Sequence, residues 1–270
     1  MFSSSSGQPL VAVVTGGAGG IGASTCRRLA EAGMRVICTD VDDDAGEQVV
    51  RQLQDQGLET HYRSLDVGSE QAWREFREWL VEQYGPPMVL VNNAGIDVVR
   101  DIFSTTLADW DRLFKVNSTA MFLGSRTFAK DMHALAESEG RFASIVNMSS
   151  ICGLIGVAFQ TAYCATKGSV RLFTKALALE CSALGLKVRV NSIHPGTVDT
   201  AFAAQCLKEL GEVGFAPSPE EARAAIAGAH PIGHMASSEE IADAIVFLAS
   251  DASRFMTGSE LVVDGGYTAR

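Results

Sequence analysis

Short apolar runs alternate with longer amphipathic segments along the whole chain. The short runs have the composition and length of β-strands, and the amphipathic segments are long enough for helices. Runs such as residues 11–14 are apolar on both faces, which is typical of strands covered by helices on both sides. The pattern predicts an α/β fold, in which a doubly wound, seven-stranded parallel sheet is flanked by helices.

The periodicity gives approximate bounds for each element. The predicted strands are residues 10–14, 35–39, 60–65, 89–91, 144–147, 187–191 and 260–263. The predicted helices are residues 21–32, 44–56, 70–84, 107–138 (one long helix or a pair), 161–184 and 239–248. After His194-Pro195-Gly196 this rhythm breaks into short helical patches, and we expect residues 197–236 to form a small helical lid over the substrate.

Charge and length limit the organisation of the protein and its partners. The 270 residues carry 22 Lys and Arg against 32 Asp and Glu, a net charge of −10 with no basic cluster. Nucleic acid and anionic membrane surfaces are therefore not expected as partners. No apolar stretch reaches the roughly 18 residues of a membrane span. We expect residues 1–8 to be a flexible tail and residues 9–270 to be a single domain.

The cysteines and histidines indicate neither disulfides nor a metal. Six cysteines lie scattered without a Cys-x-x-Cys pair, and the first apolar run is too short for a signal peptide, so a cytoplasmic location is expected. His230 and His234 are four positions apart, but Pro231 and Gly233 between them prevent a shared helical face. No metal site is expected.

A glycine-rich turn follows the first predicted strand and opens the first predicted helix. Gly16, Gly20 and Gly22 allow a tight turn and a close approach of the backbone to a pyrophosphate, and the helix N-terminus at Ile21 attracts negative charge. A purely structural turn has the same glycines, but the position between strand and helix favours a bound dinucleotide.

Asp40 ends the second predicted strand. A carboxylate there can accept hydrogen bonds from both hydroxyls of an adenosine ribose and repels a 2′-phosphate. No basic residue follows until Arg51, so the sequence predicts NAD over NADP, although Asp40 could instead be part of the turn that follows. Val41, Asp66 and Val67 complete the expected adenosine side, and Asp66 could alternatively cap the next helix.

Tyr163 and Lys167 are four positions apart near the start of a predicted helix, so their side chains share a face. An ammonium beside a phenol lowers the phenol pKa from about 10, and an oxidised nicotinamide ring acts in the same direction. Alone, such a pair is usually a solvated helix face. Here Ser149-Ser150 ends the preceding strand, at the edge where ligands bind in this kind of sheet.

Taken together, these residues resemble the short-chain dehydrogenase/reductase family. The motifs are Thr15-Gly16-x-x-x-Gly20-x-Gly22, Asn92-Asn93-Ala94-Gly95, Asn117, Ser150, Tyr163-x-x-x-Lys167 and Pro195-Gly196. The resemblance extends from Leu10 to Tyr267, and residues 170–175 and 257–269 are similar to secondary-alcohol dehydrogenases of the cyclopentanol and R-specific types.

The resemblance implies a Rossmann fold, a bound nicotinamide cofactor and a role for each catalytic residue. Tyr163 would exchange a proton with the substrate oxygen, and Ser150 would hydrogen-bond that oxygen. Lys167 would hold the nicotinamide ribose and lower the tyrosine pKa, and Asn117 would position a water in a proton relay. The other implied cofactor contacts are Asn92, Asn93, Ala94, Gly95, Pro195, Gly196, Val198 and Thr200.

Around the reacting carbon we expect an apolar pocket without a charged residue, formed by Cys152, Ile155, Thr197 and Phe202. Such a pocket suits an uncharged cyclic, aryl or alkyl secondary alcohol and its ketone. The predicted function is an NAD-dependent alcohol dehydrogenase, and the family implies a homotetramer.

Four alternatives remain open at this point. A hydroxysteroid dehydrogenase would share every motif, and a 3-oxoacyl carrier-protein reductase should prefer NADPH and offer a basic patch to its acidic partner. A methyltransferase that uses S-adenosylmethionine would not need Tyr163 and Lys167. A non-catalytic NAD-binding module would bind the cofactor without turnover.

Overall fold

Parallel strands form one seven-stranded sheet in the computed structural model, which describes residues 4–5, 7–215 and 217–269. The strand order is β3-β2-β1-β4-β5-β6-β7, so the chain winds from the middle to one edge and then crosses to the other. This order confirms the predicted doubly wound α/β fold. The strands are β1 (Val11–Thr15), β2 (Arg35–Asp40), β3 (Thr60–Ser64), β4 (Val89–Asn92), β5 (Ala143–Met148), β6 (Val188–Pro195) and β7 (Glu260–Val263).

Strand β6 is longer than the sequence pattern predicted. Instead of ending at Asn191 it continues to Pro195 and pairs with β5 on one side and β7 on the other. Ser192 and His194 interrupt the apolar pattern, but both are fully buried and their side chains bond to each other, Oγ to Nε2, at 2.9 Å. Mutual pairing of two polar side chains therefore extends a strand that periodicity alone ends too early.

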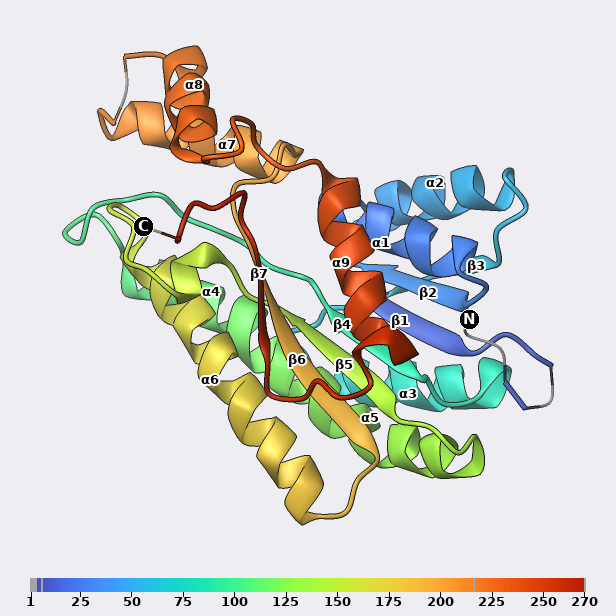
Figure 1. Cartoon of the computed structure of the whole chain (residues 1–270). Helices are drawn as coiled ribbons and strands as arrows, with labels where there is room; N and C mark the ends of the chain where they lie inside the picture. The colour runs from blue at the N-terminus through green and yellow to red at the C-terminus, as the bar shows by residue number, and fades with distance from the viewer. Residues whose placement is uncertain (1–3, 6, 216, 270) are drawn as a thin grey trace.

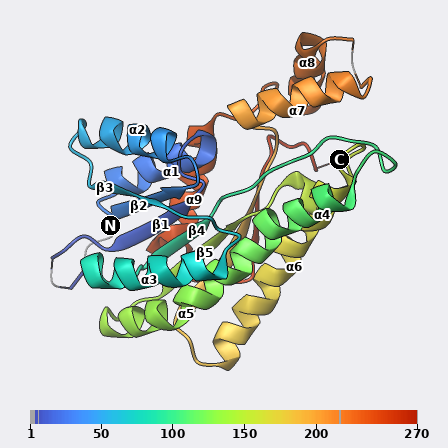
Figure 2. The same cartoon turned by 180° about the vertical axis from the view of Figure 1, so that it is seen from behind.

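Helices cover both faces of the sheet, as Figure 1 and the reverse view in Figure 2 show. Helices α1, α2 and α9 lie on one face, and α3 to α6 lie on the other. The predicted segment 107–138 is a pair of helices joined by a π-helical turn at Lys115–Thr119. The helices are α1 (Gly20–Glu31), α2 (Asp43–Gln54), α3 (Glu70–Tyr84), α4 (Leu107–Phe114), α5 (Ala120–Ser138), α6 (Thr161–Ala183), α7 (Ala201–Glu212), α8 (Pro219–Ala229) and α9 (Ser238–Ala249).

An aromatic cluster packs α3 against α5. Trp73, Phe76 and Phe128 are almost wholly buried, and Phe76 meets Phe128 edge to face with ring centres 6.0 Å apart. Strand β1 is buried along its whole length, as its two-sided apolar pattern predicted. Dense packing of this kind holds the strand ends, and therefore the residues that follow them, in fixed positions.

Helices α7 and α8 project beyond the carboxyl ends of the strands (Figure 1). A β-bridge between Val198 and Ala236 joins the two ends of this excursion. The segment predicted as a lid is thus helical and begins and ends at one point of the fold. Seven glycines and prolines made it stand out in the sequence, and Gly214, Pro217 and Pro231 lie where its helices end or have not yet begun.

The N-terminal segment is described only in part. Residues 1–3 and 6 of the predicted tail lie outside the described residues, whereas the Ser5 amide donates a hydrogen bond to Glu139 at 2.6 Å. No helix in the described part of the chain has the length and apolar character needed to cross a membrane.

Candidate active site

A cavity of about 640 Å³ lies where the strands end and α7 begins. The predicted cofactor and catalytic residues line it with two exceptions, Asn92 and Asn117. Cys152, Thr197 and Phe202 of the predicted substrate pocket also line the cavity, whereas Ile155 does not and is 37% exposed. The parallel sheet brings these residues together because all of its strands end on the same side, near the point where the strand order reverses between β1 and β4.

The glycine turn has the shape of a cradle. Gly16 and Gly20 have φ angles of +64° and +51°, which favour glycine. A Cβ atom on Gly16 would lie 2.8 Å from the Ala94 Cα, and one on Gly22 would run into the Gly16 carbonyl oxygen. A Cβ on Gly19 would meet nothing within 4 Å. The turn is thus packed tightly on the protein side and open on the other, which fits a pyrophosphate at the N-terminus of α1.

Asn93 and Thr15 fasten this turn to the end of β4. The Asn93 side-chain amide donates to the carbonyl oxygens of Thr15 and Gly16, at 2.9 and 3.0 Å. The Thr15 hydroxyl accepts from the backbone amides of Asn93 and Ala94, at 3.0 and 3.1 Å. Asn92 lies deeper and donates to the Asn147 side chain at 2.8 Å. These bonds brace neighbouring strands and leave the face over Gly95 open to the cavity.

Asp40 connects the end of β2 to the glycine turn. Its carboxylate accepts from the backbone amide of Ala18 at 3.0 Å and from those of Val41 and Asp42 at 2.8 and 3.2 Å. Asp42, not Asp40, caps α2. No described lysine or arginine forms an ion pair with Asp40, and among the described residues Lys167 is the only lysine or arginine that lines the cavity.

Asp66 does not cap α3. Ser69 is the capping residue, with its hydroxyl accepting from the Ala72 amide, and Asp66 instead accepts from the Gly68 amide at 2.9 Å. The Lys115 ammonium lies 3.7 Å from the Asp66 carboxylate. Of the two interpretations that the sequence left open, a place at the cavity wall is the one consistent with this geometry.

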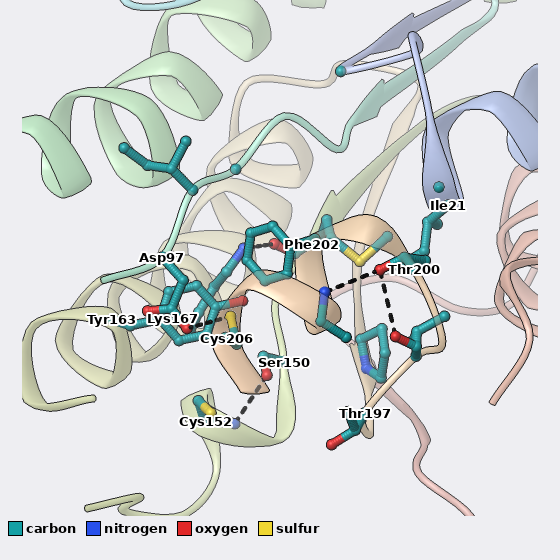
Figure 3. A pocket seen from close by; sticks show the side chains of 18 of the residues that line it. Ile21, Asp97, Ser150, Cys152, Tyr163, Lys167, Thr197, Thr200, Phe202 and Cys206 are labelled. Atoms are coloured by element: carbon teal, nitrogen blue, oxygen red, sulfur yellow. Dashed lines mark hydrogen bonds between the residues drawn. The ribbon is translucent and has the colours of Figure 1, made fainter. Parts of the chain in front are cut away.

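Tyr163 and Lys167 are both buried at the start of α6, at 8% and 2% exposure. The Lys167 ammonium donates to the Met148 carbonyl at 2.9 Å and lies 5.5 Å from the centre of the tyrosine ring. The Ser150 side chain is within hydrogen-bonding reach of the Tyr163 hydroxyl. Figure 3 shows these three residues at one end of the cavity.

Burial is the main influence on the pKa values of Tyr163 and Lys167. It raises the pKa of Tyr163 well above its ordinary value, the negative charge of Asp97 acts in the same direction, and the hydrogen bond from Ser150 opposes both. Burial also lowers the pKa of Lys167 to about 8. From the sequence, Lys167 is expected to lower the tyrosine pKa, whereas in the folded chain desolvation raises the pKa of this buried tyrosine.

Asn117 lies in the π-helical turn and is 3% exposed. Its side-chain oxygen accepts from the Ile96 amide at 2.8 Å, and its amide donates to the Ile96 carbonyl and to the Thr166 hydroxyl at 2.9 and 3.1 Å. Asn117 thus ties the loop after β4 to α6, next to the tyrosine. The extra residue of the π turn is what brings this side chain to the loop.

The end of β6 is held by the lid. A Cβ on Gly196 would lie 2.7 Å from His230 Nε2, the same nitrogen that accepts from the Thr197 amide at 3.1 Å. The other ring nitrogen of His230 bonds to the Ile226 carbonyl of α8 at 2.8 Å. Thr200 caps α7. The predicted nicotinamide end of the cavity is therefore built jointly by β6 and the lid.

Comparisons with known proteins now identify the family. A family model described as Enoyl-(Acyl carrier protein) reductase matches residues 16–268. This chain belongs to the short-chain dehydrogenase/reductase family. It is 39% identical over 259 residues to a cyclopentanol dehydrogenase of Comamonas testosteroni, covering 96% of this chain and 97% of the relative.

Two further relatives differ from the cyclopentanol dehydrogenase in the coenzyme or the substrate that their names state. An NADP-dependent (R)-specific alcohol dehydrogenase of Lentilactobacillus kefiri is 36% identical over 260 residues, covering 96% of this chain and 97% of the relative. A 3-alpha-(or 20-beta)-hydroxysteroid dehydrogenase of Mycobacterium tuberculosis is 38% identical over 259 residues, covering 96% and 89%. The family is thus shown, and its members differ in coenzyme and substrate.

Several residues of this short-chain dehydrogenase/reductase site were not predicted from the sequence. Asp97, Gln160, Cys206 and Tyr267 line the cavity as well. The expectation of a pocket without a charged residue is therefore wrong, because Asp97 brings a carboxylate into it. A signal was present in the sequence, since Asp97 follows the Asn92–Gly95 motif at the carboxyl end of β4.

Proposed function

We propose that this oxidoreductase interconverts a secondary alcohol and its ketone with NAD as coenzyme. The observation that carries the proposal is the arrangement of Tyr163, Ser150 and Lys167 in the same cavity as the glycine turn and Asp40. One end of this cavity fits a dinucleotide, and the other end offers a phenol that can exchange a proton with a substrate oxygen.

The proton chemistry follows from the side chains. When bound, the nicotinamide coenzyme supplies the hydride acceptor or donor and, in its oxidised form, a positive charge. Tyr163 gives its proton to the oxygen of a ketone, or takes the proton from the hydroxyl of an alcohol. Ser150 donates a hydrogen bond to that oxygen. Lys167, fixed by the Met148 carbonyl, would hold the nicotinamide ribose, and we assign the proton relay to Asn117.

NAD is proposed because of Asp40. The carboxylate lines the cavity and forms no ion pair with a lysine or arginine in the described part of the chain, so it favours two free ribose hydroxyls and opposes a phosphate. The relative from Lentilactobacillus kefiri is NADP-dependent by name, so relatedness alone does not decide the coenzyme.

The proposed substrates are uncharged cyclic, aryl or alkyl secondary alcohols. Phe202, Leu207 and Leu210 of α7 turn apolar side chains to the cavity. A hydroxysteroid is the second candidate, favoured by the relative from Mycobacterium tuberculosis. An acidic carrier protein, the partner that the matched family model names, fits poorly with a net charge of −10.

We also propose a homotetramer in the cytoplasm. Phe122 of α5 is 42% exposed, and Leu172 and Leu179 of α6 are 68% and 73% exposed. Apolar side chains on two neighbouring helices are suited to contacts between subunits. Light scattering with size-exclusion chromatography should give four times the mass of one chain.

The decisive experiment compares the protein with its Tyr163→Phe variant. NAD and NADP are each tested with cyclohexanol, 1-phenylethanol and a hydroxysteroid, and turnover is followed at 340 nm. We expect NAD-dependent turnover that falls about a thousandfold in Tyr163→Phe, with NAD binding unchanged in calorimetry. Tyr84→Phe is the matched control, because Tyr84 does not line the cavity.

Two results would contradict this function. If Tyr163→Phe kept most of the turnover, Tyr163 would not be the proton donor. If no alcohol or ketone changed the absorbance while NAD bound, the protein would be a non-catalytic NAD-binding module.

A further inference from the structure

Asp97 is a carboxylate in a cavity whose other walls are largely apolar. It lies in the loop between β4 and α4, and Figure 3 shows it beside Tyr163 at the substrate end. Its negative charge raises the pKa of both Tyr163 and Lys167, which places it within electrostatic reach of the reacting centre. Neither the proton exchange nor the coenzyme needs a carboxylate at this position.

The hydrogen bonds that the protein donates to this carboxylate fill only part of its acceptor sites. One oxygen accepts from the Val98 amide at 2.7 Å. The other accepts from the Gln160 side-chain amide and from the weakly donating thiol of Cys206 at 3.5 Å. An ionised carboxylate has about four acceptor sites, and no described lysine or arginine forms an ion pair with Asp97. Burial and the charge of Glu209 both raise its pKa.

Gln160 is held in place for this contact. It follows Phe159, which has a φ of +65°, a conformation that is strained for any residue except glycine. The Phe159 carbonyl accepts from the Arg100 amide at 2.8 Å, so the strained turn is tied to the same loop that carries Asp97. Backbone strain concentrates where a side chain must be positioned for function.

From this geometry we infer that Asp97 is a specificity-determining residue, which accepts a hydrogen bond from a second donor group of the substrate, a hydroxyl or an ammonium. The inference rests on the proposed alcohol dehydrogenase function and refines its substrate class to alcohols with a second donor group, which adds a charged substrate, the amino alcohol, to the uncharged ones proposed above. The preferred substrate is then a diol, a hydroxyketone or an amino alcohol on an otherwise apolar skeleton.

The physical reason is the free energy needed to remove water from the Asp97 carboxylate when a substrate binds. A wholly apolar substrate removes water from the carboxylate and returns no donor, so binding loses the desolvation free energy. A substrate with a suitably placed hydroxyl or ammonium replaces that water. Hydrogen bonds to a charged acceptor are the strong ones, so discrimination of about tenfold to a hundredfold is expected.

The test uses three substrates that differ in one group: 1-phenylethanol, 1-phenyl-1,2-ethanediol and 2-amino-1-phenylethanol. In the wild-type protein, kcat/KM for at least one of the two donor-bearing substrates should exceed that for 1-phenylethanol by about tenfold or more. Asp97→Leu should remove this preference, chiefly through KM. Asp111→Asn is the control, since Asp111 is exposed on α4 and does not line the cavity.

Asp97→Asn distinguishes a hydroxyl donor of the substrate from an ammonium donor. It is nearly isosteric with the wild type, so it also tests the inference if Asp97→Leu does not fold. An asparagine oxygen still accepts from a hydroxyl but no longer pairs with an ammonium. If the ammonium is the natural donor, this variant loses the preference for the amino alcohol, and if the hydroxyl is, it retains most of the preference for the diol.

Failure of the inference differs from failure of the function. Turnover of 1-phenylethanol without any preference for the donor-bearing substrates overturns the role of Asp97 and leaves the dehydrogenase intact. An equal loss on all three substrates in both Asp97 variants, with unchanged melting temperatures, also overturns it. No turnover of any secondary alcohol by the wild-type protein overturns both.

Discussion

Replacing Asp40 with asparagine should change the coenzyme preference more than any other single substitution in the cavity. The side chain is nearly the same size, and its remaining oxygen can still accept from the Val41 and Asp42 amides. The position facing the Ala18 amide becomes an NH2 group, so one donor faces another. The variant therefore keeps the turn after β2 and loses its negative charge.

The expected magnitude follows from the bonds at stake. A hydrogen bond to a charged acceptor contributes about 1.5–3 kcal/mol, against about 1 kcal/mol for a neutral one. Losing one carboxylate contact to the ribose and weakening the other amounts to about 2 kcal/mol, or about a thirtyfold increase in the Kd for NAD. Removing the repulsion of a 2′-phosphate at this partly exposed site adds about 1.4 kcal/mol for NADP, or about tenfold.

Calorimetric titration of the protein with each coenzyme measures both Kd values without any substrate. The ratio of the two should shift toward NADP by about 300-fold in Asp40→Asn. Asp42→Asn is the matched control, because Asp42 neighbours Asp40 but caps α2 outside the cavity. A ratio that stays within twofold of wild type in Asp40→Asn, or a wild-type protein that prefers NADP, would refute the reasoning.

Three further predictions concern stability and pH. Arg189→Leu should destabilise the fold by about 2–4 kcal/mol in urea denaturation, because the buried guanidinium donates to four carbonyls in the last turn of α9 and just after it. A loss below about 0.5 kcal/mol would speak against this. Burial acts to raise the pKa of Glu260, but Arg171 and Lys175 lower this pKa to about 2, below the unfolded value of about 4.3. The stability from Glu260 is present above about pH 4.3 and is lost as the pH falls toward 2. Glu260→Gln should therefore make the melting temperature depend less on pH in this acid range, and an unchanged dependence would exclude this contribution of Glu260. Because burial raises the pKa of Tyr163, kcat/KM for alcohol oxidation should increase with pH through neutrality while ketone reduction stays flat, and an oxidation plateau below about pH 7 would instead mean that the charge of the bound oxidised nicotinamide outweighs burial.

Most of the sheet could be predicted because buried strands such as β1 are short, continuous apolar runs in the sequence. The exceptions have tertiary causes. Strand β6 continues through Ser192 and His194 because each satisfies the other. The break between α4 and α5 carries no glycine or proline, and what accompanies the π turn is the contact of Asn117 with Ile96.

In the site, too, some residues could be predicted from the sequence and others could not. The glycine turn, Asp40 and the Tyr163–Lys167 pair could be found because their spacing depends on a single strand end or a single helix face. Asp97 and Gln160 are 63 positions apart and meet only when the loop after β4 folds against the start of α6. Periodicity contains no information about such a contact, and the apolar pocket predicted from neighbouring residues lacked it.

The protonation of Tyr163 shows why neighbours in sequence are not enough. Four residues of helix place Lys167 beside the ring, and from that spacing alone its charge should favour the phenolate. Folding also removes both groups from water, aims the ammonium at the Met148 carbonyl and brings the Asp97 carboxylate close, and each of these effects weakens or opposes that influence. The chain by itself therefore holds Tyr163 protonated at neutral pH, in the state that a ketone reductase needs. Alcohol oxidation requires an additional positive charge in the cavity, so the direction of catalysis at neutral pH depends on what occupies the site rather than on the tyrosine and lysine alone.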